Sequence, residues 1–273
     1  MGMQLEEVQK KRGISSAVLK NVAVITMLID HIGAVIIARL LISNGFYAAM
    51  VNQEAYVAWM EQNSILYGSY MAMRVVGRLA FPIYCFLLVE GFQKTHDIKK
   101  YLGRMFLFAL LSEIPFDLAL SGRAWNMEYQ NVFFTLLIGL AVIAALRMAE
   151  QYFVESGKGE KLLRILLYAC IIAAGCVAAF IFKTDYSFKG VMAIVVLYLF
   201  RNRKNAQIWA GVIIFLLMDG VEMIAALSFI LIRFYNGTRG RQNKYFFYFF
   251  YPVHLLILWL ICVAIGIAGI PAV

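Results

Sequence analysis

Long apolar runs alternate with short charged segments along the whole chain. Most of these runs approach the about 20 residues that an α-helix needs to cross the hydrocarbon core of a bilayer. Backbone groups in lipid have no water to bond, so such runs are predicted to be helices. The pattern therefore predicts an all-α, polytopic transmembrane helical bundle of about nine spans, near residues 18–42, 72–92, 101–121, 131–149, 162–183, 187–200, 206–219, 221–235 and 246–269.

Three of these spans are unusual. Span 187–200 is short for a full crossing, and only Gly220 separates spans 206–219 and 221–235. A tilted or re-entrant segment is the alternative in this region. No linker, low-complexity segment or internal repeat is evident, so residues 1–273 are predicted to form a single transmembrane domain.

The distribution of basic residues predicts the orientation. Cytoplasmic loops of membrane proteins are enriched in Lys and Arg. A cytoplasmic N-terminus and an external C-terminus place 19 of the 25 basic residues on the cytoplasmic side and leave six for the outer half: Arg39, Arg74, Arg78, Arg123, Lys183 and Lys189. The opposite orientation would invert this bias.

Composition argues against several other classes of protein. Hydrophobic residues make up 63% of the 273 residues, far more than a water-soluble domain of this length could bury. The net charge of +9 lies in loop clusters, which is typical of membrane topology and argues against nucleic-acid binding. The four cysteines lie in apolar spans without CxxC spacing, so no disulfide framework and no metal site is predicted.

Ionisable residues inside the predicted spans lie at similar depths. At 1.5 Å per residue, Arg78 matches Glu113 and Arg74 matches Asp117, each about 5–12 Å below the outer surface. His31 lies about 10 Å below the same surface. Charges in lipid are costly and usually pair or perform chemistry. We therefore expect Arg78–Glu113 and Arg74–Asp117 pairs, with a purely structural ionic lock as the alternative.

His31 is the strongest candidate for chemistry. Asp30 precedes it, Gly33 would admit a neighbouring helix, and an Arg/Glu pair is expected at its depth. The alternative is a neutral imidazole that only bonds another helix. Further polar residues are expected to complete an outward-facing cavity, which Pro82 and Pro115 would widen: Arg74, Asp117, Gln130, Asn131, Thr135, Asp185, Asp219, Glu222 and His254.

Seven ordered motifs resemble those of the TraX family, known for N-terminal acetylation of conjugative pilin. They span nearly the whole chain: IDHIG (29–33), RVVGRLAFP (74–82), VEGF (89–92), SEIPFD (112–117), QNVFFTL (130–136), YNGTRG (235–240) and FYPVHL (250–255). The resemblance implies a transmembrane acyltransferase of the bacterial cytoplasmic (inner) membrane, akin in architecture to the acyltransferase family 3 enzymes. Cytoplasmic acetyl-CoA or another acyl-CoA would be the donor.

That resemblance suggests roles for four residues. His31 would act as general base or carry the acyl group, Asp30 or Glu113 would orient it, and Arg78 would stabilise the oxyanion. The acceptor amine or hydroxyl would belong to a protein N-terminus, a peptide, a glycan or a lipid. A proton-coupled transporter or exporter, with the same charges as a proton relay, is the alternative function.

The donor's phosphates would need cations at the cytoplasmic side. Segment 233–244 is the better candidate, because its glycines permit backbone conformations that point amides at an anion. Segment 94–104 is the alternative, and basic loops also arise for topology alone. The expected donor-binding residues are Arg233, Asn236, Arg239, Arg241 and Lys244.

Overall fold

The computed structural model describes residues 13–153, 158–218 and 220–272, which are almost entirely helical. In chain order the elements are α1 (Ser16–His31), the π-helical turn η1 (Ile32–Ile37), α2 (Ala38–Ser43), α3 (Phe46–Ala49), α4 (Gln53–Gly77), α5 (Ala80–Gln93), α6 (Ile98–Ser121), α7 (Val132–Tyr152), α8 (Lys158–Ile181), α9 (Ser187–Leu199), α10 (Lys204–Leu216), the 3₁₀ segment η2 (Gly220–Leu227), α11 (Ser228–Arg233) and α12 (Lys244–Ala264).

Five helical segments of the described chain are long and apolar enough to cross a membrane. They are Ser16–Ser43, Gln53–Gln93, Val132–Tyr152, Lys161–Ile181 and Phe246–Ala264. Helices α9 and α10 are apolar but shorter, at 13 residues each. The all-α prediction is confirmed, and these segments accord with a polytopic membrane protein. The count of nine spans and the orientation stay predictions.

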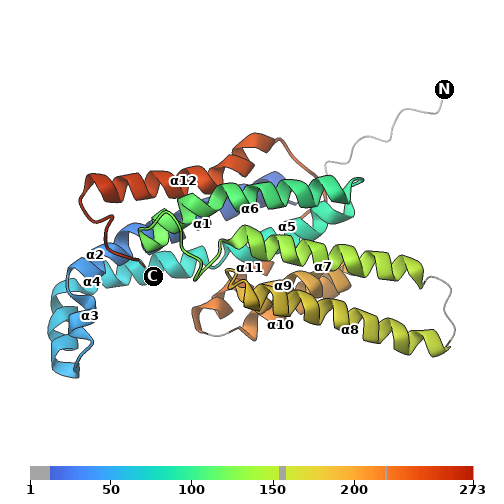
Figure 1. Cartoon of the computed structure of the whole chain (residues 1–273), viewed down its shortest axis with the longest axis horizontal. Coiled ribbons are helices and arrows are strands. Elements are labelled where there is room, and N and C mark those ends of the chain that lie inside the picture. The colour runs from blue at the N-terminus through green and yellow to red at the C-terminus, as the bar shows by residue number, and fades with distance from the viewer. Residues whose placement is uncertain (1–12, 154–157, 219, 273) are drawn as a thin grey trace.

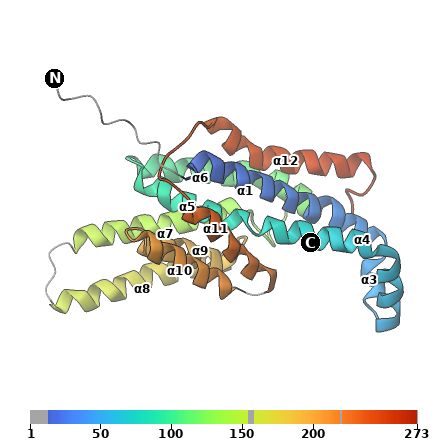
Figure 2. The same ribbon diagram turned by 180° about the vertical axis from the view of Figure 1, so that it is seen from behind.

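The helices form an elongated bundle (Figures 1 and 2). Helices α1, α6 and α12 pack along one side, and α7 to α10 pack along the other. Helix α5 contacts both groups through α1 and α9. Helix α3 lies at one end of the long axis, and the far ends of α7 and α8 lie at the other.

Local sequence fixes several helix ends. The side chains of Asn52, Asp97 and Asn131 accept hydrogen bonds from backbone amides at the starts of α4, α6 and α7, which are otherwise unpaired. Gly122 ends α6 with φ +73°, a left-handed conformation that glycine adopts without strain. These caps set where each helix begins and ends, and thereby the level of the polar residues it carries.

Helices α4 and α5 are separated by a break at Arg78 and Leu79. Pro82 explains the break, because its ring has no N–H to donate to the carbonyl oxygen of Arg78 and crowds that carbonyl. The helix distortion caused by Pro82 thus lies one turn before the proline, at Arg78 and Leu79. The break places Arg78 at a bend in the middle of the bundle.

A π-helical turn, η1, follows His31 directly. Such turns accommodate one residue more than an α-helical turn and occur frequently at functional sites. Beyond it, Arg39 is fully buried and donates to the carbonyl oxygens of Val35 at 2.8 Å and Ala119 at 2.5 Å. Arg39 therefore caps the C-terminus of α6, where carbonyl groups lack helical partners and the helix dipole favours a cation.

Candidate functional site

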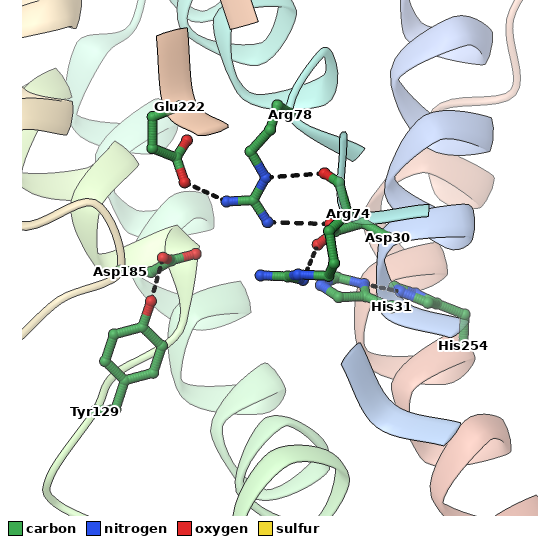
Figure 3. A network of polar contacts seen from close by, with 8 residues as sticks. All are labelled: Asp30, His31, Arg74, Arg78, Tyr129, Asp185, Glu222 and His254. Atoms are coloured by element: carbon green, nitrogen blue, oxygen red, sulfur yellow. Dashed lines mark hydrogen bonds and ion pairs between the residues drawn. The ribbon is translucent and has the colours of Figure 1, made fainter. Parts of the chain in front are cut away.

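An ion-pair network joins three helical segments in the middle of the bundle (Figure 3). Arg74 of α4 donates to Asp30 of α1 at 2.7 Å, and Arg78 donates to the other oxygen of the same carboxylate at 3.0 Å. Arg78 also pairs with Glu222 of η2. Asp30 and Arg78 are both buried, so this network of Asp30, Arg74, Arg78 and Glu222 holds α1, α4 and η2 together.

Gly77 makes the close approach of α1 and α4 possible. A Cβ atom at this position would lie 2.2 Å from Cβ and Oδ1 of Asp30, far inside van der Waals contact. Gly33 plays a similar, weaker part, because a Cβ there would lie 3.0 Å from Cβ of Met73. The expectation that Gly33 admits a neighbouring helix is confirmed.

The predicted pairs of Arg78 with Glu113 and of Arg74 with Asp117 are wrong. Equal depth gives the height of a residue but not the direction in which it points. Helix α4 packs against α1, whereas α6 packs against α7 and α12, so the arginines and these two carboxylates face different neighbours. Both arginines pair with Asp30 instead.

The carboxylates of α6 bind the start of α7 and the loop before it. Asn131 donates its side-chain amide to Glu113 and to the carbonyl oxygen of Ala109, the latter at 2.9 Å. Asp117 accepts from the backbone amide of Asn126 at 2.7 Å. Within the described residues neither carboxylate has a basic partner, so Glu113 and Asp117 fix a loop rather than an ion pair.

Residues at the head of α7 bind the loop between α8 and α9. The backbone of Gln130 pairs with Lys183 and Asp185, at 3.0 Å and 2.9 Å. The hydroxyl of Thr135 donates to the carbonyl oxygen of Asp185, and the phenol of Tyr129 donates to its carboxylate. Sequence reasoning missed Tyr129, for which its place beside Gln130 was the only signal. Asp219 lies outside the described residues.

His31 contacts His254 of α12 rather than Asp30. The Nδ1 atom of His31 lies 2.6 Å from Nε2 of His254, and the two rings stack with centroids 4.9 Å apart. In Figure 3 the guanidinium group of Arg74 lies on the other side of His31. Asp30 and Glu113 were the two candidates for orienting the imidazole; Asp30 bonds Arg74 and Arg78, Glu113 bonds Asn131, and the hydrogen-bond partner of His31 is His254.

The partners of His254 define the tautomer of His31. Nδ1 of His254 lies 2.6 Å from the carbonyl oxygen of Phe250, which can only accept, so this nitrogen carries a proton. A neutral His254 then accepts at Nε2, and His31 donates to it from Nδ1. The lone pair of a neutral His31 is thereby left on Nε2, where it can take a proton from another molecule.

A cavity of about 700 Å³ lies near the start of α1. Its lining combines three basic and three aromatic side chains, and among the described residues Glu90 is its single acidic one. Its lining residues are Gly13, Phe86, Glu90, Arg201, Lys204, Gln207, Arg233, Phe234, Tyr235, Asn236 and Gly237. We call this the basic cavity.

Only part of the predicted donor-binding set reaches the basic cavity. Arg233 and Asn236 line it. Arg239 and Arg241 are exposed and do not line it. The side chain of Lys244 lies outside the described residues. Arg201 lies in the turn between α9 and α10, and Lys204 is the first residue of α10; sequence reasoning treated both only as topology signals.

Among the described residues, no three His, Cys, Asp or Glu side chains are grouped as a metal site would require. The candidate site has two parts: a histidine pair beside an ion-pair network, and a basic cavity nearer the start of α1.

Comparison with known proteins gives one family and one named relative. The model of the TraX protein family matches residues 15–262. The chain is 28% identical, over 88% of its own length and 92% of the relative's, to a protein of Dichelobacter nodosus described as "Probable fimbrial assembly protein FimC, serogroup H1". No solved structure matches the chain. Because the family model covers nearly all of the sequence, the chain belongs to the TraX family.

Proposed function

We propose that this protein is a membrane-bound acyltransferase. It would move an acetyl or other acyl group from cytoplasmic acyl-CoA to an amine or hydroxyl in the outer half of the bacterial cytoplasmic membrane. The observation that carries the proposal is the chain of contacts from Phe250 through His254 to His31, which leaves Nε2 of His31 as a proton acceptor. Such a group is what a general base requires.

The proposed reaction is a single acyl transfer. Nε2 of His31 removes the proton from the acceptor as its nitrogen or oxygen attacks the thioester carbonyl. The new C–N or C–O bond forms, the C–S bond breaks, and the CoA sulfur leaves with the proton that His31 received. His254 keeps its own proton throughout, because its contact with Phe250 holds that proton at Nδ1.

Arg74 is the residue we propose for the oxyanion. Arg78 is engaged by Asp30, Glu222 and the carbonyl oxygen of Arg74. Arg74 bonds Asp30 through Nη1 alone, and its side chain is 26% exposed. Its remaining N–H groups would donate hydrogen bonds to the oxyanion that forms beside His31. Fixed donors at a developing oxyanion are a large contribution to the acceleration of acyl transfer.

The acceptor we propose is the N-terminal amine of a pilin or fimbrial subunit. Family membership and the relative described as a fimbrial assembly protein support this choice. The amine attacks the thioester carbonyl in its uncharged form and must lose a proton as the new bond forms. A base placed beside the thioester would accept that proton.

The test measures release of CoA from acetyl-CoA and transfer of a radiolabelled acetyl group to a peptide amine by the purified protein in detergent. His31→Ala should lower turnover about 10²- to 10⁴-fold, the usual contribution of a general base. His96→Ala is the matched control, since His96 is an exposed loop histidine and should not affect turnover.

Two outcomes would overturn the proposal. Full turnover by the His31→Ala variant would remove the assigned base. Absence of both hydrolysis and transfer by the wild-type protein, together with proton-coupled uptake of a solute into proteoliposomes, would favour the transporter.

A further inference from the structure

The basic cavity brings together cations from two loops that are distant in sequence. Arg201 and Lys204 flank the start of α10, and Arg233 ends α11. Helices α10 and α11 contact each other, which places the three side chains around one opening. Neither Lys204 nor Arg233 forms an ion pair with a carboxylate among the described residues; they bond the carbonyl oxygen of Tyr235 at 2.8 Å and the side chain of Asn205 at 3.1 Å.

From this arrangement we infer that the basic cavity binds the phosphate groups of the nucleotide end of acyl-CoA, an inference that rests on the proposed function. Arginine and lysine are the side chains that grip phosphate oxygens, and within the described part of the chain Lys204 and Arg233 have no anionic partner. Helix α10 adds to the attraction, because its first turn lines the cavity and no side chain caps its N-terminus.

The separation along α5 between Arg78 and the cavity is comparable to the length of the remainder of the donor. Phe86 and Glu90 line the cavity and lie 8 and 12 residues after Arg78, which corresponds to about 12–18 Å along the helix. The pantetheine arm has the backbone length of about four extended residues, or about 14 Å. A donor bound by its phosphates in the cavity can therefore extend its pantetheine arm along α5 toward the level of Arg78.

Replacing Glu90 should strengthen anion binding in the cavity, whereas replacing Lys204 or Arg233 should weaken it. Its carboxylate pairs with Lys94 at 2.9 Å, and Lys94 also donates to the hydroxyl of Tyr235 at 3.0 Å. Replacing Glu90 by Gln removes the cavity's one negative charge and frees Lys94. Anion binding should become stronger, whereas general damage to the loop would make it weaker.

The experiment measures binding of CoA and of adenosine 3′,5′-bisphosphate by calorimetry to the purified protein in neutral phosphatidylcholine nanodiscs. Lys204→Gln and Arg233→Gln together should raise Kd for both probes about a hundredfold, at about tenfold for each lost charged hydrogen bond. Glu90→Gln should lower Kd severalfold. Arg239→Gln with Arg241→Gln is the matched control, because it removes the same number of charges from the adjoining exposed loop, and Kd should stay within about twofold.

The outcomes separate this inference from the proposed function. Nucleotide binding that depends on the cavity, in a protein without acyl transfer, would support the inference and refute the function. Transfer whose KM for acetyl-CoA is unchanged by the Lys204/Arg233 variant would refute the inference alone. Displacement of bound nucleotide by phosphatidylglycerol in the nanodisc would assign the cavity to a lipid headgroup and overturn the inference.

Discussion

Replacement of Asp30 by Asn removes the carboxylate that two arginines share. The side chains of Asp30 and Arg78 are 13% and 8% exposed, and breaking a buried ion pair costs about 3–5 kcal/mol. Arg78 keeps Glu222 as a partner, so the lower end of this range applies. Solvent partly screens the pair with Arg74, whose side chain is 26% exposed, so losing this pair adds less than about 1 kcal/mol to the destabilisation. We expect a loss of about 3 kcal/mol, or about a hundredfold in the ratio of folded to unfolded protein.

The assay is equilibrium unfolding in mixed micelles, followed by tryptophan fluorescence. Asp97→Asn is the control, because it removes one charge from an exposed pair with Lys100 while Asn still caps α6; its unfolding curve should match the wild type. A double-mutant cycle of Asp30→Asn with Arg78→Gln should give a coupling of about 2 kcal/mol. Strictly additive effects, or an unchanged curve for Asp30→Asn, would show that the network does not hold α1 to α4.

Three further predictions follow from the same structure. Gly77→Ala should destabilise the protein by several kcal/mol, because its methyl group would overlap Asp30; an unfolding midpoint equal to wild type would contradict the packing of α1 on α4. Glu113→Gln should leave the unfolding midpoint nearly unchanged, since its carboxylate bonds only amide groups; a large loss would reveal a basic partner. In a cysteine-free background, a cysteine at Asn52 should react with an impermeant reagent on intact cells and one at Arg241 should not; reaction at both would refute the predicted orientation.

The helices and the level of the polar site could be predicted from the sequence because both follow from distance along an axis. Lipid requires apolar helices of a given length, and each residue adds a fixed rise, so Asp30, His31, Arg74 and Arg78 were expected at one depth. The direction in which each side chain points depends on which helices are neighbours. One sequence does not contain that information, and for this reason Glu113 was assigned to the wrong partner.

The same limit applies to the histidine pair and to the lining of the basic cavity. The sequence predicts His254 among the residues of the outward-facing cavity, but its contact with His31 depends on α12 lying beside α1. From segment 233–244, Arg233 and Asn236 line the basic cavity, and the role of the segment in donor binding stays a prediction. Arg201 and Lys204 reach it only because α10 and α11 pack together, which no motif in either loop reveals.

The π-helical turn after His31 has a consequence for how this sequence can change over evolution. A π turn holds one residue more than an α-helical turn, and each residue of an α-helix rotates the chain by about 100°. A lineage that lost one residue from Ile32–Ile37 would turn Arg39 away from the end of α6, or turn His31 away from His254. The insertion is therefore retained as long as both the cap on α6 and the histidine pair are needed, and alignments of relatives should contain no gap at this turn.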